Sequence, residues 1–418
     1  MIYLYVFFTF LIYPFQFLIP VFSKKAKIFL DRRKTDRKKI SELRQDFTNK
    51  RVIWLHAASV GELDQCKALI GVIRKNEPET IVVQSVFSES VKDENLQSLD
   101  VFLAFRLPLD FYFAYDYIFK KFKPEMVILM AWDSWPNLIL SAKRFHSKIF
   151  LFCASLNKSS GRNSFFMKSL TESVFRKLDA ISASSEYFLP EFSALIKDNV
   201  KIYALGDTRV DSVIRKIETK DSKADPVKRL LPLTKKTIIL ASTYSACEEA
   251  IIPKIQDLLE KDINVWIFPH HIGEKRIREI SDLLAANRIS FSIFSEIEKK
   301  AERVILFDKL GILAYAYEHA ELAYVGGAIH NRVHNVLEPA YFGLAIVTGK
   351  KIFHSPEAIS LKNSGGLFSI EEPKDIPLKI LQLLNQEENL KAIRKKNRAF
   401  VLSQKGASLR LYEKFIKA

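Results

Sequence analysis

Short apolar runs alternate with longer amphipathic stretches along most of the chain. Between residues 52 and 205 the apolar runs are rich in β-branched and aromatic residues, and they occur at 52–56, 80–86, 126–130, 148–154, 180–183 and 200–205. Stretches of helical length with a repeated apolar face separate them, at 63–75, 134–145 and 165–177. Strands that alternate with helices are typical of βαβ units and predict an α/β fold with a parallel sheet.

The same alternation begins again in the second half, with apolar runs at 237–241, 265–268, 303–307, 322–325 and 345–347. A polar, charged stretch at 215–233 separates the halves and is interpreted as a linker. The pattern predicts two Rossmann-like domains, at 52–214 and 234–418, with the last helix packing back on the first domain. A length of 418 residues suits two domains. Because open α/β sheets bind ligands beyond the carboxyl ends of their strands, we expect a cleft in which the two sets of strand ends face each other.

The first 22 residues contain no charged side chain, and a basic segment follows them. Residues 23–51 hold twelve Lys and Arg against four acidic residues, which is half of the net charge of +16. A helix of this length would span about 33 Å, enough for a bilayer core of about 30 Å. We therefore expect 1–22 to be a membrane anchor and 23–51 to attract anionic lipids from the cytoplasmic side. Pro14 and Pro20 leave a kinked or interfacial helix open, whereas a buried core helix would not explain the basic flank.

The composition narrows the function classes. Apolar residues make up 48% and charged residues 27%, a globular balance that excludes a disordered or fibrous chain. The three cysteines are far apart, which excludes a disulfide scaffold and a cysteine-rich zinc site. The chain has no G-x-G-x-x-G, no G-x-S-x-G and no correctly spaced P-loop, and His330 and His334 lack the glutamate of an H-E-x-x-H metal site. Beyond residue 51 there is no basic–aromatic stripe, so nucleic acid is not an expected partner.

Three polar segments follow predicted strands in the first half. In VIWLHAASVGEL (52–63), Glu62 falls at a helix start, either as a capping carboxylate or as a general base that the helix N-terminus keeps ionised. Asp133 precedes Trp135 in a strand-to-helix loop, either as an N-cap or as a group that holds a sugar hydroxyl or stabilises positive charge. Arg209, in GDTRVD (206–211), is either a fork for phosphate or carboxylate or an ordinary surface arginine.

Two segments early in the second half suit an anion or a nucleotide. The small, polar turn that carries Ser242 and Thr243 offers backbone N–H groups and hydroxyls to an anion. His270, in the segment FPHH (268–271) at the end of a predicted strand, could stack on a base or form a hydrogen bond with it.

The most specific stretch is VGGAIHNRVHNVLEPA (325–340). Gly326 and Gly327 follow a strand, where they would let the backbone approach a ligand closely. Asn335 to Glu338 would open a helix whose N-terminus attracts a phosphate, and Glu338 could hold two ribose hydroxyls. A glycine turn followed by an acidic helix start would explain these parts without a ligand, although not their combination.

Together these segments resemble the 3-deoxy-D-manno-octulosonic acid (Kdo) transferases, membrane-attached enzymes of lipopolysaccharide synthesis with a glycosyltransferase-B fold. The matching blocks follow the family's order and are HAASVGE, WPNL, GDTRVD, ASTYSACEE, VGGA and HNVLEPA. The resemblance implies an inverting transfer of Kdo from CMP-Kdo to a lipid A precursor, at the cytoplasmic face of the inner membrane. One phosphate is within the capacity of arginines and helix dipoles, so we expect neither a metal nor another cofactor.

The resemblance also implies roles for single residues. It places the general base at Glu62 and assigns Asp133 and Arg209 to the transition state. We expect the acceptor near Ser59, Gly61 and Trp135. The residues expected to bind the CMP-sugar are Ser242, Thr243, Pro269, His270, Leu310, Gly311, Ile312, Gly326, Gly327, Asn335, Val336, Leu337 and Glu338.

Several positions depart from the family's pattern. The family usually has Glu-x-Glu before Leu-Trp-Pro, whereas this chain has Ala131-Trp-Asp133, and Arg209 replaces a lysine. An Arg-His pair becomes His270-His271, and Arg332 stands where the family has glycine. These changes leave two alternatives open. The chain could use a different nucleotide sugar or lipid acceptor, or it could be a membrane-tethered binding protein that has lost its activity.

Overall fold

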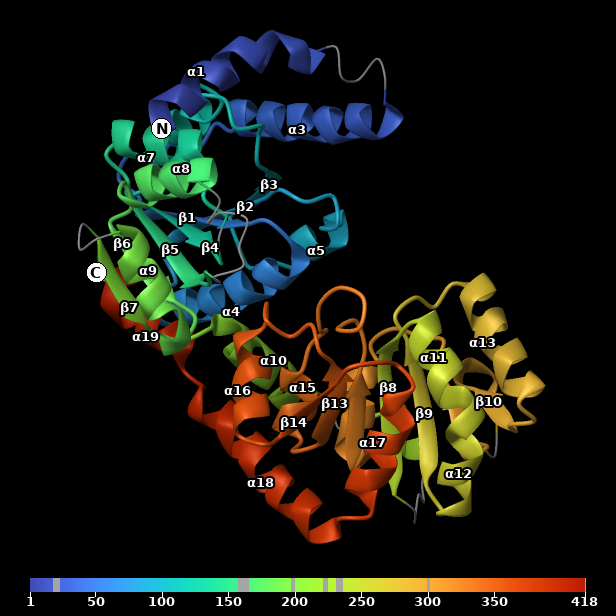
Figure 1. The fold of residues 1–418 in the computed structure, drawn as a ribbon. Coiled ribbons are helices and arrows are strands. Elements are labelled where there is room, and N and C mark those ends of the chain that lie inside the picture. Colours follow the sequence, from blue (N-terminus) through green and yellow to red (C-terminus); the bar gives the residue numbers. More distant parts are fainter. Residues whose placement is uncertain are drawn as a thin grey trace. The chain divides into compact units, whose positions relative to one another are not determined.

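The computed structural model describes residues 1–17, 23–131, 133–156, 165–196, 200–220, 225–230, 236–298 and 301–417. Residues 18–22 of the predicted anchor and residues 221–224 and 231–233 of the predicted linker lie outside these ranges. The chain forms two compact units, Met1–Ser212 with Gly406–Ala418, and Val213–Lys405. Each unit contains a seven-stranded parallel sheet, which confirms the predicted α/β class (Figure 1).

The sheet of the first unit has the strand order β3-β2-β1-β4-β5-β6-β7. The first six strands in this order, β3-β2-β1-β4-β5-β6, follow the order that is typical of Rossmann folds, with a switch point between β1 and β4, and β7 is added at the edge. Every residue of β1 is buried, because apolar clusters cover both faces of the sheet. The strands are β1 (Val52–Ala57), β2 (Ile81–Val86), β3 (Leu103–Arg106), β4 (Met126–Met130), β5 (Lys148–Ala154), β6 (Ala180–Ala183) and β7 (Lys201–Ala204).

Helices surround this sheet. The first four helices after β1 are α4 (Val60–Asn76), α5 (Asp93–Gln97), α6 (Asp116–Phe122) and α7 (Pro136–Arg144). They are followed by α8 (Phe165–Phe175), η3 (Glu186–Phe188), α9 (Leu189–Ile196) and α10 (Thr208–Glu218). The predicted linker begins at 215, but residues 215–218 form the last turn of α10. The helix continues because Val210, Val213 and Ile214 place a buried apolar face on it at helical spacing.

The end of the chain completes the first unit. Helix α19 (Ala407–Leu411) and the turn η9 (Tyr412–Ile416) contribute Leu411, Tyr412 and Ile416 to the apolar cluster beneath α4. Asp211 fixes the entry of this segment by accepting the N–H groups of Gly406 at 2.6 Å and Ser408 at 2.7 Å. The Tyr412 hydroxyl donates to Glu77 at 2.8 Å. Residues as far as 335 positions apart are therefore in contact within this unit.

The apolar N-terminal run does not form one continuous helix. Helix α1 (Ile2–Ile12) ends just before the 3₁₀ turn η1 (Tyr13–Phe17), which contains Pro14. Proline removes an N–H donor and clashes with the preceding helical turn, so a break is expected there. Over the residues that are described, the structure has no helix with both the length and the apolar character needed to cross a bilayer.

The basic segment folds as helix α3 (Lys24–Glu42), which packs against β3 and α6. Figure 1 shows α1 and α3 running alongside each other on one side of the first unit. Between them and residues 108–117 lies a pocket of about 670 Å³, lined by Phe10 and Tyr13 and by Arg33, Lys34 and Arg37 of α3. Helix α1 also touches α7 and α8, and it buries Ile2 and Thr9.

The sheet of the second unit has the order β10-β11-β9-β8-β12-β13-β14, with a switch point between β8 and β12. Its strands are β8 (Thr237–Thr243), β9 (Asn264–Pro269), β10 (Phe291–Ile293), β11 (Val304–Leu306), β12 (Leu322–Val325), β13 (Ala345–Gly349) and β14 (Leu367–Ile370). The longer helices are α11 (Ser245–Ile251), α12 (Ile255–Glu260), α13 (Glu274–Ala286), α16 (Pro356–Asn363), α17 (Asp375–Leu384) and α18 (Glu387–Ser403). The shorter ones are η5 (Lys228–Leu230), η6 (Ile252–Lys254), η7 (Phe294–Glu296), α14 (Leu313–Ala316), η8 (Tyr317–His319) and α15 (Leu337–Tyr341).

Candidate active site

The carboxyl ends of β1, β2 and β4 bring three polar side chains together at the switch point of the first sheet. His56 and Ser85 are register partners on β1 and β2, and the His56 Nδ1 and Ser85 Oγ atoms lie 2.8 Å apart. His56 Nε2 lies 2.9 Å from Oδ2 of Asp133, which follows β4. The Trp54 indole donates to Ser85 Oγ at 2.8 Å. A continuous hydrogen-bonded path therefore runs from the buried core to Asp133.

Trp135 holds Asp133 from the other side. Its indole N–H donates to Asp133 Oδ2 at 2.9 Å and lies 3.2 Å from His56 Nε2. The Trp135 ring packs on Phe87, with centroids 4.5 Å apart. At the start of the same turn, Ala131 has a φ of 59°, a left-handed conformation that is uncommon for alanine. Tryptophan and histidine together fix the position of the carboxylate.

Glu62 is the third residue of α4, and its carboxylate makes the capping contacts that were expected as one of its two alternatives. Its Oε2 atom accepts the backbone N–H groups of Ala58 and, at 3.0 Å, of Ser59, so it caps the helix start. Burial, together with the negative charge of Asp133, raises the pKa of Glu62 to about 7. Burial and Asp133 therefore outweigh the two N–H donors through which the helix N-terminus was expected to keep Glu62 ionised. A carboxyl group with a pKa near neutrality can accept and release protons efficiently.

The other predicted residues of the first unit lie around α4. Arg209 is half-buried in the first turn of α10, and its N–H donates to Asp207 Oδ1 at 2.8 Å. Asp207 also accepts from Gln65 of α4 at 2.7 Å, which ties the Arg209 loop to the helix that carries Glu62. Ser59 is the N-cap residue of α4. Gly61 is exposed, and no atom lies within 4 Å of the position that a Cβ would take there.

In the second unit, a pocket of about 220 Å³ brings together six of the predicted donor residues. These are Ser242, Pro269, His270, Leu310, Gly311 and Glu338. Lys216 and Lys309 also line it, and the Lys216 ammonium lies 3.0 Å from Glu338 Oε1. The pocket thus combines a hydroxyl, a carboxylate, an imidazole and two cations with apolar walls from Phe268 and Phe307.

The remaining predicted donor residues serve the second unit in other ways. The Thr243 hydroxyl is buried and donates to Glu248 at 2.6 Å, and Asn335 Oδ1 accepts the N–H of Leu337 at 2.9 Å. Val336 and Leu337 are buried in the core, and Ile312 is the N-cap residue of α14.

Gly326 and Gly327 permit close approach within the chain. A Cβ on Gly326 would lie 2.1 Å from the Ser242 carbonyl oxygen, and one on Gly327 would lie 2.4 Å from that of Arg332. Gly327 also has a φ of 94°. Close contact between two backbone segments of the protein therefore already requires glycine at these positions, and the expected approach of a ligand stays a prediction.

Sequence reasoning missed a stack of rings beside His270. The His334 ring lies 4.5 Å from that of His270, and Tyr244 stacks on His270 at 4.8 Å. The Tyr244 hydroxyl and His334 Nε2 are 2.9 Å apart. Burial lowers the pKa of His334 to about 4, helped by His270 and Arg332, so its ring is neutral at pH 7. The signal was present, because Tyr244 lies in the ASTYSACEE block and His334 in HNVLEPA.

Sequence reasoning also missed His56 and Ser85 in the first unit. His56 opens the HAASVGE block that contains Glu62, but a single histidine at the end of a buried strand has no distinctive pattern. Ser85 sits on a different strand, and only the strand register places it opposite His56.

Several known proteins are similar to this chain in sequence. The sequence profile of the family described as 3-deoxy-D-manno-octulosonic-acid transferase (kdotransferase) matches residues 32–212. The chain is 27% identical to the 3-deoxy-D-manno-octulosonic acid transferase of Chlamydophila psittaci, over 87% of this chain and 84% of that protein. It is 25% identical to the enzyme of the same name from Haemophilus influenzae, over 86% of each chain. With the one from Rickettsia bellii it shares 27%, over 92% of this chain and 94% of that one.

Two solved structures show the fold. A UDP-GlcNAc 2-epimerase from Neisseria meningitidis aligns with a TM-score of 0.64 at 14% identity, over 88% of this chain and all of that chain. A glycosyltransferase from Rickettsia africae aligns with a TM-score of 0.62 at 14% identity, over 87% and 97%. At these identities the likeness concerns the fold alone, a chain of two α/β units.

Proposed function

We propose that this chain, which is a glycosyltransferase of lipopolysaccharide biosynthesis homologous to the Kdo transferases, moves Kdo from CMP-Kdo onto the glucosamine disaccharide of a lipid A precursor. The choice of Kdo as the transferred sugar rests on the names of the relatives, and the mechanism is argued from the side chains of this chain. The observation that carries the mechanism is the Glu62 carboxyl group, which is buried, has a pKa of about 7 and is electrostatically coupled to Asp133. Such a group is suited to take a proton from a sugar hydroxyl at neutral pH.

The proposed reaction is a single displacement with inversion. The acceptor hydroxyl oxygen forms a bond to the anomeric carbon of Kdo while the bond from that carbon to the CMP phosphate oxygen breaks. The hydroxyl proton goes to Glu62, and the electron pair of the broken bond leaves with CMP. Asp133, held by His56 and Trp135, stabilises the positive charge that develops on the sugar. Ser59 and Gly61, at the start of α4, leave room for the acceptor.

The donor is assigned to the pocket of the second unit. His270 and its stacked partners Tyr244 and His334 offer a flat, neutral surface to the cytosine base. Glu338 can accept two ribose hydroxyls, and the cations Lys216 and Lys309 suit a phosphate. We assign Arg209 to the leaving phosphate as well. The scheme routes no step through a metal ion or another cofactor.

We also propose that the protein works at the cytoplasmic face of the inner membrane and binds it through its N-terminal elements. Tyr3 and Phe10 of α1 are 71% and 65% exposed, and lysines open α3. Aromatic side chains at the headgroup level, next to basic residues, are typical of interfacial attachment. This placement would keep Glu62 near an acceptor that stays in the bilayer.

The test is transfer by the detergent-solubilised protein, with CMP-Kdo, a lipid A precursor and mass spectrometry as the readout. We expect the acceptor to gain one or more Kdo units. Glu62→Gln should lower the rate by roughly 10²–10⁴-fold, because it removes the base. It should still be stabilised by CMP against thermal unfolding, because the nucleotide pocket lies in the other unit. Asp64→Asn, on the same helix, is the matched control and should stay active.

Two outcomes would contradict the proposal. If the folded protein leaves both substrates unchanged and UDP stabilises it more than CMP, the donor is a different nucleotide sugar. If Glu62→Gln transfers Kdo at the rate of the unaltered protein, another group is the base.

A further inference from the structure

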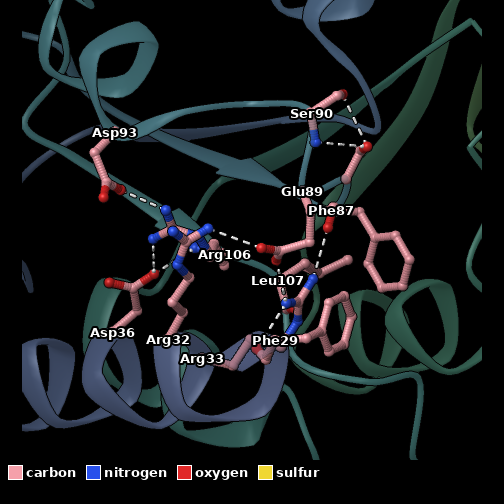
Figure 2. A network of polar contacts seen from close by, with 11 residues as sticks. Phe29, Arg32, Arg33, Asp36, Phe87, Glu89, Ser90, Asp93, Arg106 and Leu107 are labelled. Atoms are coloured by element: carbon pink, nitrogen blue, oxygen red, sulfur yellow. Dashed lines mark hydrogen bonds and ion pairs between the residues drawn. The ribbon is translucent and has the colours of Figure 1, made fainter. Parts of the chain in front are cut away.

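Arg33 of α3 is buried among backbone carbonyl groups of the first unit (Figure 2). Its guanidinium donates to the carbonyl oxygens of Leu107 at 2.8 Å, Phe87 at 2.6 Å and Phe29 at 3.0 Å. It also lies 3.3 Å from the Glu89 carboxylate. Burying a cation is unfavourable unless it is paired and its donors are satisfied, as they are here. The buried Arg33 thus attaches α3 to the segment that follows β2.

A second group of charges already attaches α3 to the sheet. Asp36 accepts the backbone N–H of Arg106 at 2.9 Å and its guanidinium at 3.2 Å, and Arg106 also pairs with Asp93. Arg32 binds the other oxygen of Glu89 at 2.8 Å. Figure 2 shows these contacts side by side with those of Arg33. Arg33 adds to these contacts a direct hydrogen bond to the Phe87 carbonyl.

Phe87 connects this network to the candidate active site. The Arg33 guanidinium binds the Phe87 carbonyl and lies 5.1 Å from the centroid of the Phe87 ring. The other side of the connection is the Trp135 ring, 4.5 Å from that of Phe87. Trp135 in turn donates to Asp133. The basic helix is thus linked to the carboxylate through two packed rings.

We propose that Arg33 is a positioning residue, which holds Phe87 against Trp135 so that the indole keeps Asp133 in place next to His56. The role of Asp133 in transfer rests on the function proposed above, whereas the mechanical link from Arg33 to Trp135 does not. The path from Arg33 to Asp133 runs through the rings of Phe87 and Trp135. Misplacing a reacting group by about 1 Å can slow a reaction by up to about 100-fold, so a small shift of Trp135 should be measurable.

The first test needs no activity. The protein has four tryptophans and can be labelled with 5-fluorotryptophan, whose four ¹⁹F resonances are assigned by single Trp→Phe variants. Arg33→Met should shift the resonance of Trp135 and leave that of Trp266, in the other unit, unchanged. Arg32→Met is the matched control, because Arg32 shares Glu89 but does not hold Phe87. An unchanged Trp135 resonance in Arg33→Met would overturn the proposal.

The second test uses transfer kinetics. Arg33→Met should lower kcat roughly tenfold without changing KM for CMP-Kdo, since the donor is assigned to the other unit. In a Trp135→Phe background the same substitution should have no further effect, because both residues act on one path. Equal losses in both backgrounds would show that Arg33 merely stabilises the fold.

A variant that keeps Arg33 tests the proposal even if Arg33→Met fails to fold. Phe87→Leu leaves the carbonyl that Arg33 binds and removes only the ring, so it should reproduce both the ¹⁹F shift and the loss of kcat. If it does neither, the proposal is wrong. Absence of transfer by the unaltered protein would count against the proposed function alone, because the ¹⁹F measurement would still decide the link.

Discussion

At the scale of single residues, the properties of Glu62 come from partners that are distant in the sequence. Its place after a strand and at a helix start was readable from residues 52–63. Its pKa was not, because the shift depends on burial and on Asp133, which lies on the loop after β4. The sequence did not point to His56 for a similar reason, since its partner Ser85 lies on β2 and its partner Asp133 lies on the loop after β4. Sequence patterns locate a residue on an element, whereas charge coupling requires the fold.

The coupling predicts a pH dependence. The base must be deprotonated, so kcat should rise as the pH increases through about 7, the value to which burial and then Asp133 raise the pKa of Glu62. Asp133→Asn removes one of these causes, so the pKa of Glu62 should fall and the rising limb should move to lower pH. The maximal rate should also fall, because charge stabilisation is lost. The measurement is kcat for Kdo transfer between pH 5 and pH 9.

Asp64→Asn serves as the control, because it removes a carboxylate from the same helix. The rising limb of its kcat–pH profile should stay at the pH seen in the unaltered protein. A rising limb at the same pH in Asp133→Asn and the unaltered protein would mean that Glu62 is not the titrating base.

At the scale of elements, the sequence predicted strands and helices better than it predicted their ends. The apolar run 1–22 was expected to form a membrane-anchor helix, with a kink left open at Pro14 and Pro20, and in the structure α1 stops at Ile12 and Pro14 lies in η1. The helix expected at 335–338 is the short α15, starting at Leu337. The start of α7 depends on a carboxylate from another loop, Asp110, which no local pattern around residue 136 could reveal. Helix ends are set by contacts that arrive from elsewhere in the chain.

Asp110 provides a test of this dependence. Its carboxylate accepts the N–H groups of Asn137 at 3.2 Å and Leu138 at 3.3 Å, together with the Tyr115 hydroxyl at 2.7 Å. Asp110→Ala leaves these buried donors without an acceptor and should lower the free energy of unfolding by about 1–3 kcal/mol. Denaturant-induced unfolding at neutral pH measures the change. Asp31→Ala, at an exposed position of α3, should change the stability by less than about 0.5 kcal/mol. Equal effects of the two substitutions would contradict the capping role.

At the scale of the whole molecule, the repeated alternation of strands and helices was enough to predict two α/β halves, and two parallel sheets confirm it. The last helix was expected to pack back on the first half, where residues 406–418 lie, but the contacts that attach it could not be predicted from the sequence. The Tyr412 hydroxyl bonds Glu77 across 335 positions, and the separation of such contacts leaves no periodic signal in the sequence. Strands β3, β10 and β14 were missed; each is short and contains residues that are only half-buried, so none forms a fully apolar run.

The N-terminal elements predict how the whole protein distributes between water and lipid. Phe7 and Phe10 are exposed on α1, so Phe7→Glu combined with Phe10→Glu should lower binding to vesicles of anionic phospholipid at least tenfold, since each buried phenyl ring contributes about 2 kcal/mol. Vesicle co-sedimentation measures the effect. Leu378→Glu, which alters an exposed apolar residue of the second unit, is the control. Unchanged co-sedimentation of the double variant would place the attachment elsewhere.

The return of residues 406–417 to the first unit has a consequence for how the protein is made. Translation supplies β1 and α4 early, but Leu411, Tyr412 and Ile416, which fill the cluster beneath α4, leave the ribosome only after the entire second unit. The half that is synthesised first is therefore completed last. During that interval its apolar surface is uncovered, which is when a nascent chain most needs a chaperone, and a premature stop codon after residue 405 would leave that surface uncovered permanently.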